Sequence, residues 1–405
     1  MGIKLDIQQV DGGLTIIKGI KASGISCGLK KSKKDLAVIY SEQPAVAAGV
    51  FTRNLVQAAP VKLCRERVGN LIRAIVINSG NANACTGETG FKHACQMAEL
   101  AGRELKISPD QVLVCSTGVI GQQLPMYKIR TGISQAVSAL TGEASGALNA
   151  AEAILTTDTV IKQAAYRASL PQGAVHLAGI AKGSGMIAPN MATMLAFLVT
   201  DVRISRGLLQ KLLIRAVDSS FNLITVDGDT STNDTALLLA NGASGVEIRE
   251  DGHSSELFYR MLEKACRRLA YQVVADGEGT TKVIALTISG APDHFAARRL
   301  AKAVLNSPLV KTAFFGQDAN WGRITSALGN AGVHFDPQKV DIYLGPVQVA
   351  AAGGAVDFNE QAAGAVMQQT EVPVLVDLHA GKAKVTAWGT DLSPEYVNIN
   401  SSYRS

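Results

Sequence analysis

A loop that contains glycine and proline runs directly into an apolar strand between Ala181 and Asp201, and this junction constrains the fold more than any other part of the sequence. The residues from Met194 to Val199 form a continuous apolar run, which predicts a strand. Thr193 stands at the beginning of that run. The chain must therefore place a hydroxyl where an irregular loop enters a sheet.

This junction has an ordinary interpretation and a chemical one. Threonine is a good strand residue, so Thr193 could simply satisfy a backbone group. However, Gly183, Gly185 and Pro189 permit a strained backbone, and Ala192 is small enough for the Thr193 hydroxyl to reach its carbonyl. An N-to-O acyl shift could then cut the chain before Thr193. The freed α-amine, with a reference pKa of about 7.7 to 8.0, would serve as the general base of the same residue.

The length and composition favour an enzyme-sized α/β protein. A chain of 405 residues with 47% hydrophobic and only 5% aromatic residues can bury one large core or two ordinary ones. The pattern predicts internal strands covered by helices, without a linker or repeat that would mark a domain boundary. A strand, a turn and a second strand are expected over 35–52, a strand over 71–80, another over 282–290, and a hairpin over 374–389. Helices are expected over 92–105, over 128–155 with a break near 141, over 207–221 and over 253–273.

Several motifs resemble those of the ornithine acetyltransferase family, and they occur in order along essentially the whole chain. The segment from Lys182 to Phe197 is similar to the self-cleavage signature of that family, in which the threonine of an Ala-Thr pair is both cleavage site and nucleophile. The other motifs are VFTRNLVQAAPV at 50–61, INSGNANACTG at 77–87, STGVIG at 116–121, TTDT at 156–159, TVDGDTSTNDT at 225–235, DGEGTTK at 276–282, FFGQDANWGRI at 314–324 and YVNINSSYRS at the C-terminus.

The resemblance assigns a role to residues that alone would have ordinary interpretations. Most Thr-Gly turns only reverse the chain, but Thr117 and Gly118 are implied to form the oxyanion hole. Lys182 is implied to bind a substrate carboxylate, and Glu278 the amine of ornithine. The remaining implied substrate contacts are Thr156, which is preferred over Thr157, and Asn400 and Ser405 of an ordered C-terminal tail. Ser405 stands where the family is expected to have threonine, and it keeps the hydroxyl.

The resemblance also implies a reaction and a fold. The acetyl group of N-acetylornithine would pass to Thr193 and then to glutamate, in a ping-pong reaction that needs no metal or organic cofactor. Acetyl-CoA would be a second acetyl donor, a substrate of a bifunctional enzyme. The fold would be a layered α/β/β/α sandwich, like that of the self-processing β-peptidyl aminopeptidases. The fragments 1–192 and 193–405 would assemble as a heterotetramer of two α and two β chains.

Other classes of function find little support in the sequence. The net charge is only +5, and no stripe of basic residues interleaved with aromatic ones is present, which argues against nucleic-acid binding. The lysines at 30, 31, 33 and 34 are expected to lie on a solvated face of a loop. The acidic run with Asp227, Asp229 and Asp234 lacks the terminal glutamate of an EF-hand, so turn chemistry and no metal are expected. No apolar stretch has the roughly 20 residues of a bilayer span, and the N-terminus lacks a signal-peptide core, so a cytoplasmic protein is expected.

Two rival functions remain open at this stage. An aminopeptidase or amidohydrolase could use the same self-generated threonine and pass the acyl group to water; Lys182, Glu278 and the C-terminal motif argue against it. A non-catalytic protein that kept the fold is opposed by the intact Ala192-Thr193 pair and by the oxyanion motif. Failure both to cleave and to exchange acetyl groups would revive the second rival.

Overall fold

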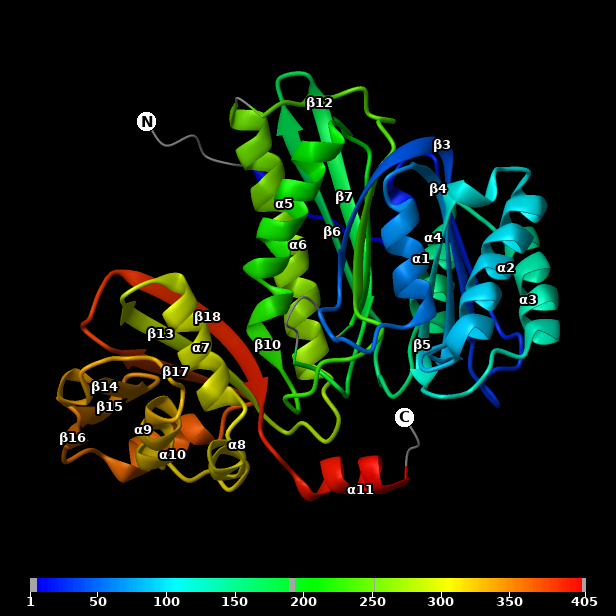
Figure 1. Cartoon of the computed structure of the whole chain (residues 1–405). Coiled ribbons are helices and arrows are strands. Elements are labelled where there is room, and N and C mark those ends of the chain that lie inside the picture. Colours follow the sequence, from blue (N-terminus) through cyan, green and yellow to red (C-terminus); the bar gives the residue numbers. More distant parts are fainter. Residues whose placement is uncertain (1–5, 189–193, 251, 403–405) are drawn as a thin grey trace.

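The structure is a computed structural model that describes residues 6–188, 194–250 and 252–402 (Figure 1). Most of the chain up to residue 275 builds a nine-stranded sheet in the order β1-β6-β7-β8-β11-β3-β4-β5, with β2 paired to β3. Its strands are β1 (Ile7–Gln9), β2 (Ile20–Ile25), β3 (Leu36–Phe51), β4 (Leu71–Asn81), β5 (Val112–Val119), β6 (Lys162–Leu170), β7 (Gly173–Lys182), β8 (Leu195–Thr200) and β11 (Thr235–Ala240).

The long strand β3 folds this sheet into two layers. Its first half pairs with β2 and β4, and its second half pairs with β11. The register with β4 shifts between Tyr40 and Ala45, where the Ser41 hydroxyl donates to the Gln43 carbonyl oxygen (2.6 Å). The turn expected within 35–52 is therefore wrong: it is an irregularity in one continuous strand, and there the strand passes from one layer to the other.

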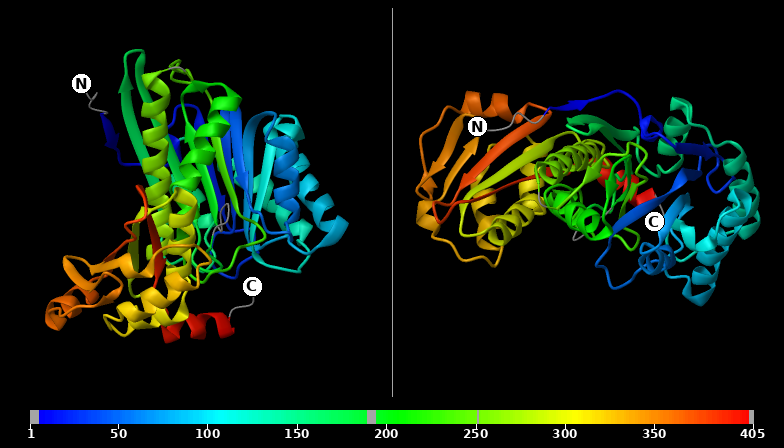
Figure 2. Two further views of the ribbon diagram at one scale, coloured as in Figure 1. Left: turned by 60° about the vertical axis from the view of Figure 1, so that its left-hand side comes forward. Right: turned by 90° about the horizontal axis from the view of Figure 1, so that it is seen from above.

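Helices cover both outer faces of the folded sheet. The helices α5 (Arg206–Asp218) and α6 (His253–Ala275) pack on one face, and α2 (Gly87–Leu105) and α3 (Met126–Ser138) pack on the other (Figures 1 and 2). A third apolar cluster, which includes residues of β3, β4, β7 and β8, fills the space between the two layers of sheet. The expected α/β/β/α sandwich is confirmed. The helices α1 (Ala59–Arg67) and α4 (Ala144–Ala153) complete this part of the chain.

The apolar run after residue 193 is strand β8, and its composition follows from its place in the sheet. All six residues of β8 are buried. Leu195 and Phe197 point into the cluster between the layers, whereas Ala196 and Leu198 point into the cluster under α5 and α6. A strand that is buried on both faces has a continuous run of hydrophobic residues in its sequence. β8 lies between β7 and β11, so the strands that precede and follow the expected fragment boundary at 192/193 are neighbours in one sheet.

The C-terminal part builds a second sheet that the sequence analysis did not recognise as a separate unit. Its order is β10-β18-β13-β17-β14-β15-β16, and its helices are α7 (His294–Leu305), α8 (Pro308–Phe315), α9 (Trp321–Gly329) and α10 (Glu360–Met367). The strands are β10 (Ile224–Thr225), β13 (Val283–Ala291), β14 (Asp341–Leu344), β15 (Val347–Ala351), β16 (Gly354–Ala355), β17 (Glu371–Asp377) and β18 (Ala383–Thr390). Two further short strands, β9 (Arg203–Ile204) and β12 (Glu247–Ile248), pair with each other.

The hairpin expected over 374–389 is wrong, because β17 and β18 lie on opposite sides of β13. The segment that joins them crosses the end of β13, where the Leu378 and Ala380 N–H groups donate to the carbonyl oxygens of Ser289 (3.0 Å) and Gly290 (2.7 Å). Gly381 is required at this crossing, since a Cβ there would lie 2.3 Å from the Ala291 carbonyl oxygen. The helices expected over 92–105, 128–155, 207–221 and 253–273 are confirmed as α2, α3 with α4, α5 and α6.

No described helix combines the length and the apolar composition needed to cross a bilayer. The segment after α5 joins the second sheet as β10, which pairs in parallel with β18, and this pairing links the two parts of the chain. Lys311 of α8 is buried at this junction, and its Nζ donates to the carbonyl oxygen of Val226 (2.8 Å) and to both oxygens of Thr390. Burial lowers the pKa of Lys311 to about 8, although Asp391 and Asp227 oppose this.

Lys311 should make stability depend on pH. Its pKa is lower in the folded chain than in the unfolded one, so between these values the unfolded chain binds more protons and the free energy of unfolding rises with pH. We expect a gain of about 2 kcal/mol between pH 7 and pH 10 that Lys311→Met lacks. Urea unfolding of both proteins at the two pH values measures it. The exposed Lys264→Met is the control, and an equal gain in the wild type and Lys311→Met would contradict the assignment.

Candidate active site

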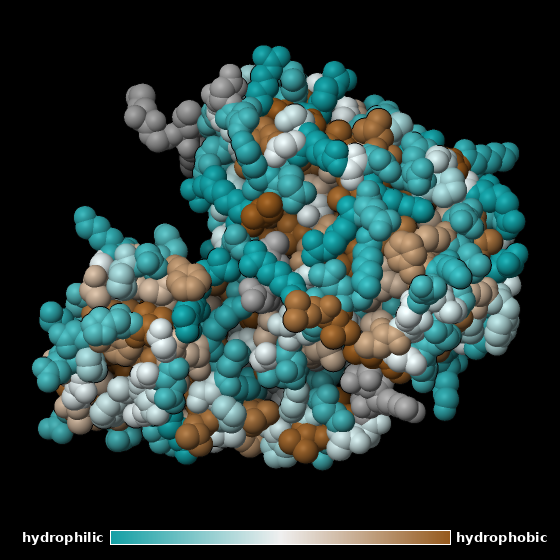
Figure 3. All heavy atoms as spheres, in the orientation of Figure 1, coloured by the Kyte–Doolittle hydropathy of each residue, from teal (hydrophilic) through white to brown (hydrophobic). Residues whose placement is uncertain are grey.

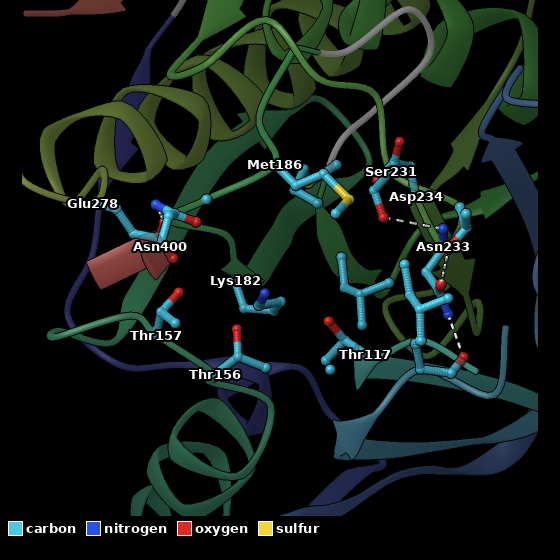
Figure 4. Close-up of a pocket in the computed structure, with 17 residues that line it drawn as sticks. Thr117, Thr156, Thr157, Lys182, Met186, Ser231, Asn233, Asp234, Glu278 and Asn400 are labelled. Carbon is cyan, nitrogen blue, oxygen red and sulfur yellow. Dashed lines mark hydrogen bonds between the residues drawn. The ribbon is translucent and has the colours of Figure 1, made fainter. Parts of the chain in front are cut away.

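A pocket of about 690 Å³, including its open mouth, gathers the predicted site residues at the ends of β5 and β7. Thr117, Gly118, Thr156, Lys182, Glu278 and Asn400 all line it, together with Thr157 (Figure 4). Its size is typical of a small-molecule site. Ala192, Thr193 and Ser405 lie outside the described residues. Met194 and Leu195, which directly follow the predicted nucleophile, do line the pocket.

Thr117 and Gly118 lie at the end of β5, pressed against the end of β4. Gly118 has a φ of +128°, and a Cβ on it would lie 2.4 Å from the carbonyl carbon of Gly80, so no other residue fits here without a shift. Asn233 fixes the two strand ends, since its amide donates to the carbonyl oxygens of Ala82 (2.6 Å) and Ser116 (2.8 Å). The Thr117 hydroxyl is thus placed by a rigid backbone.

Lys182 ends β7 with its ammonium group almost entirely buried. Its Nζ lies 3.8 Å from Oδ2 of Asp158, a carboxylate that is only 2% exposed. Burial lowers the pKa of Lys182 below the usual lysine value, while Asp158 opposes that shift. A partly compensated, buried cation of this kind favours the binding of an anion such as a substrate carboxylate.

Asp158 organises this side of the pocket. Its carboxylate accepts hydrogen bonds from the backbone N–H groups of Thr156 (2.9 Å) and Gly183 (2.7 Å) and from Nζ of Lys162 (2.7 Å). Burial alone would raise the pKa of Asp158, but Lys182 and Lys162 together with these hydrogen bonds hold it below its usual value. One carboxylate therefore fixes the turn at Thr156 and the end of the strand that carries Lys182.

Glu278 lines the pocket as a buried carboxylate that is 8% exposed. Its Oε2 accepts a hydrogen bond from the Asn400 side chain (2.8 Å), which comes from the C-terminal helix α11 (Pro394–Ser402). Gly185 allows this placement, because a Cβ on it would lie 2.4 Å from Cδ of Glu278. In the view of Figure 4, Glu278 and Asn400 lie on one side, Thr117 on the other and Lys182 between them.

The helix α11 is held against the pocket by backbone contacts, although none of its residues is buried. Gly279 has a φ of +68°, and a Cβ on it would lie 2.4 Å from the backbone nitrogen of Tyr396. The Ser393 hydroxyl also donates to the Gly279 carbonyl oxygen (2.6 Å). These contacts hold the segment that carries Asn400 beside the pocket.

The expected turn chemistry of the acidic run is observed at Asp227, whose Oδ1 accepts a hydrogen bond from the Asp229 N–H (3.2 Å). Its carboxylate accepts hydrogen bonds from the N–H groups of Met186 (2.6 Å) and Ile187 (2.8 Å), and it thereby holds the loop whose Met186 lines the pocket. Within residues 6–188, 194–250 and 252–402, no three side chains of His, Cys, Asp or Glu are grouped as metal ligands would be.

The basic run near residue 30 is not a solvated face throughout. Nζ of Lys30 donates to the Leu155 carbonyl oxygen (2.8 Å), directly before the Thr156 turn, and burial lowers the pKa of Lys30 to about 8. Nζ of Lys34 pairs with Glu152 (2.6 Å) of α4. These two lysines tie the N-terminal loop to the segment that leads into the pocket, so the expectation for the run is wrong at both positions.

Sequence reasoning missed three residues that support the pocket: Asp158, Lys162 and Asn233. Asp158 lies inside the TTDT motif, but its side chain accepts from the N–H of Thr156, two residues before it, whereas the usual turn contact of an aspartate is with the N–H two residues after it. Lys162 shows no signal either, because a lysine that opens a strand is ordinarily solvent-exposed. Asp158 lies only four positions before it, but the contact of Lys162 with Asp276 (2.6 Å) joins residues 114 positions apart.

The layered fold and a pocket that combines a buried lysine, a buried glutamate and a rigid Thr-Gly strand end define an enzyme for a small, charged substrate. The family model described as the ArgJ family matches residues 21–405. The chain belongs to the ArgJ family, and with it to the acetyltransferases of arginine biosynthesis.

A curated relative agrees with this membership, and two solved structures are similar to parts of this chain. The arginine biosynthesis bifunctional protein ArgJ of Caldanaerobacter subterraneus subsp. tengcongensis is 48% identical over 405 residues, which are 98% of this chain and 100% of that protein. The structure of ornithine acetyltransferase complexed with ornithine from Mycobacterium tuberculosis is 40% identical, with a TM-score of 0.44 over 46% of this chain and 100% of that one. A β-aminopeptidase from Burkholderia sp. matches with 15% identity and a TM-score of 0.45 over 67% of this chain and 90% of its own.

Asp158→Asn should destabilise the protein strongly, because it removes the negative charge that compensates two buried lysines. Breaking a buried ion pair by removing one partner costs about 3–5 kcal/mol. Urea unfolding at pH 7 measures the loss, with Asp110→Asn, an exposed aspartate 3.8 Å from Arg67, as the control. A loss below about 1 kcal/mol, like that expected for the control, would show that Asp158 does not hold the pocket together.

Proposed function

We propose that this enzyme transfers the acetyl group of N-acetylornithine to glutamate through an acetyl ester on Thr193, after cleaving its own chain between Ala192 and Thr193. The observation that carries the proposal is the pair of oppositely charged, buried side chains, Lys182 and Glu278, in one pocket with Thr117, Gly118 and Met194. An ion network that only stabilised the fold would not need a lysine and a carboxylate that both face an open pocket. A substrate that carries both charges does need such a pocket.

Substrate recognition follows from these charges. N-acetylornithine carries an α-carboxylate and a side-chain ammonium group, which complement Lys182 and Glu278. The amide of Asn400 and the hydroxyls of Thr156 and Ser405 would complete the polar contacts. Because Lys182 and Glu278 are largely desolvated, each charge-assisted hydrogen bond to substrate is stronger than one at the surface.

The acyl transfer occurs in two balanced steps. The Thr193 hydroxyl oxygen attacks the acetyl carbonyl carbon, its proton passes to the Thr193 α-amine and then to the departing amine, and the amide C–N bond breaks to release ornithine. The α-amine of glutamate then attacks the ester, and the hydroxyl of Thr193 is restored. In both steps the Thr117 hydroxyl and the Gly118 N–H donate to the oxyanion.

The two fragments would remain one folded unit. β7 precedes the proposed cleavage site and β8 follows it, and these strands pair over six residues of each. Cleavage would remove one covalent link without opening the sheet. We further propose that two copies of each fragment form a heterotetramer and that the enzyme works in the cytoplasm. We also propose acetyl-CoA as a second acetyl donor, which would give this chain two activities, as the word bifunctional in the name of the relatives says of them.

Ping-pong kinetics test this proposal directly, with Glu278→Gln as the diagnostic variant. The wild type should give parallel double-reciprocal lines for N-acetylornithine and glutamate. Glu278→Gln, which keeps the shape but not the charge, should raise the KM for N-acetylornithine about tenfold or more. Gly185→Ala should act in the same direction because its new methyl group displaces Glu278.

Glu99→Gln, on the exposed face of α2, and Gly364→Ala, where an added Cβ meets nothing within 4 Å, are the matched controls. Intersecting lines would contradict the acetyl-enzyme route. Release of acetate at the same rate without glutamate would favour the amidohydrolase instead.

A further inference from the structure

A second pocket lies at the junction of the two sheets, apart from the residues of the candidate active site. It occupies about 810 Å³ with its mouth and is lined from three directions: by Arg53 after β3, by Asp218 and Asn222 at the end of α5, and by α7. The residues of α7 are Phe295, Arg298, Arg299 and Lys302. In Figure 3, hydrophilic side chains gather along this junction between the two sheet units.

The charge of this pocket is strongly unbalanced. Among its described lining residues four are cations and one, Asp218, is an anion. Asp218 already accepts a hydrogen bond from Asn222 (2.7 Å) and lies 3.5 Å from Arg298. Arg299 donates to the carbonyl oxygen of Ala331 (3.0 Å), which leaves its positive charge without a described carboxylate partner.

The helix α7 presents these groups as one face. Residues 295, 298, 299 and 302 follow the i, i+3, i+4, i+7 spacing that places side chains on one side of a helix. A basic helix face is usually only solvated, but this one faces Arg53 across a pocket instead of open water. Burial and the charge of Arg298 lower the pKa of Lys302 to about 8, so an anion in the pocket would stabilise its charged form.

An aromatic ring lies beside the cations. Phe295 is 70% exposed, and the guanidinium group of Arg299 lies 5.9 Å from the centre of its ring. Arginine forks match phosphate oxygens, and an exposed aromatic ring offers a stacking surface for a nucleobase. The chemistry favoured by this combination is that of a nucleoside phosphate.

The loop that carries Arg53 connects this pocket with the candidate active site. The Thr52 hydroxyl donates to the carbonyl oxygen of Ser231 (2.8 Å), and the Asn54 amide to that of Thr230 (2.8 Å). Ser231 lines the active-site pocket. The same loop exposes Leu55 fully and Val56 by half, an apolar surface suited to an extended, weakly polar chain.

We propose that the pocket formed by Arg53, Arg298, Arg299, Lys302 and Phe295 binds the nucleotide end of acetyl-CoA, whose pantetheine arm crosses the loop at Leu55 to the active site. This rests on the proposed acetyl-Thr193 route. There the thioester C–S bond breaks as the Thr193 oxygen forms the ester, and the hydroxyl proton leaves with the thiolate as free CoA thiol.

Charge reversal at Arg298 and Arg53 tests the assignment. Arg298→Glu and Arg53→Glu should each raise the KM for acetyl-CoA in glutamate acetylation about tenfold, the loss expected for one charge-assisted hydrogen bond. Exchange between N-acetylornithine and glutamate should be unchanged in both, which also shows that the variants fold. Lys264→Glu, on the exposed face of α6, alters the net charge equally and should change neither reaction.

Calorimetric titration with 3′,5′-ADP and with inorganic phosphate shows whether the pocket binds a nucleotide or only a free phosphate ion. Binding of 3′,5′-ADP that is weakened by salt and lost in Arg298→Glu, together with competitive inhibition against acetyl-CoA, is the expected result. Phosphate binding with unaltered acetyl-CoA kinetics in the variants would overturn the CoA assignment, and absence of binding by either anion would overturn the site. Loss of exchange in the wild type would instead refute the proposed function.

Discussion

The carboxylate of Asp158 is the interaction on which the active-site side of the molecule depends. It is fully enclosed, with Lys162 and Lys182 around it and with backbone N–H groups of Thr156 and Gly183 bonded to its oxygens. Through Lys162, which also contacts Asp276, the same network reaches the end of α6, two residues before Glu278. A buried charge of this kind is tolerable only if every partner stays in place. The network therefore fixes Lys182 and the loop of Glu278 relative to each other.

The folded sheet explains why these groups meet. β3 passes from one layer to the other, so the ends of β5 and β7 and the beginning of β8 lie at the same rim. Thr117 comes from one layer and Lys182 from the other, while the second sheet supplies α11 with Asn400. The pocket is thus built from three parts of the fold. Asn233 holds two of the strand ends through its side-chain amide, so placement of Thr117 does not depend on a flexible loop.

The sequence predicted the four-layer sandwich and the gathering of the site residues more completely than the architecture of the C-terminal part. Strong helical spacing identified α2, α5 and α6, and the uniform apolar run identified β8, because local periodicity carries that information. The hairpin over 374–389 was wrong because β13 pairs between its two strands, and pairing partners distant in sequence leave no local pattern. Asn233 was missed for the same reason, because the carbonyl groups that it contacts belong to residues distant in the chain. Lys162 was missed because a lysine that becomes buried looks like an exposed one in the sequence, although one of its partners, Asp158, is only four residues away.

Self-cleavage and acetyl transfer can both be followed by intact-protein mass spectrometry of the wild type and Thr193→Ala, incubated with N-acetylornithine in the presence and absence of glutamate. We expect two wild-type fragments that meet between Ala192 and Thr193, an acetyl adduct on the second fragment that glutamate removes, and an uncut variant. A single, unmodified wild-type chain would refute the role of Thr193, because neither the cleavage nor the acetyl-enzyme would then exist.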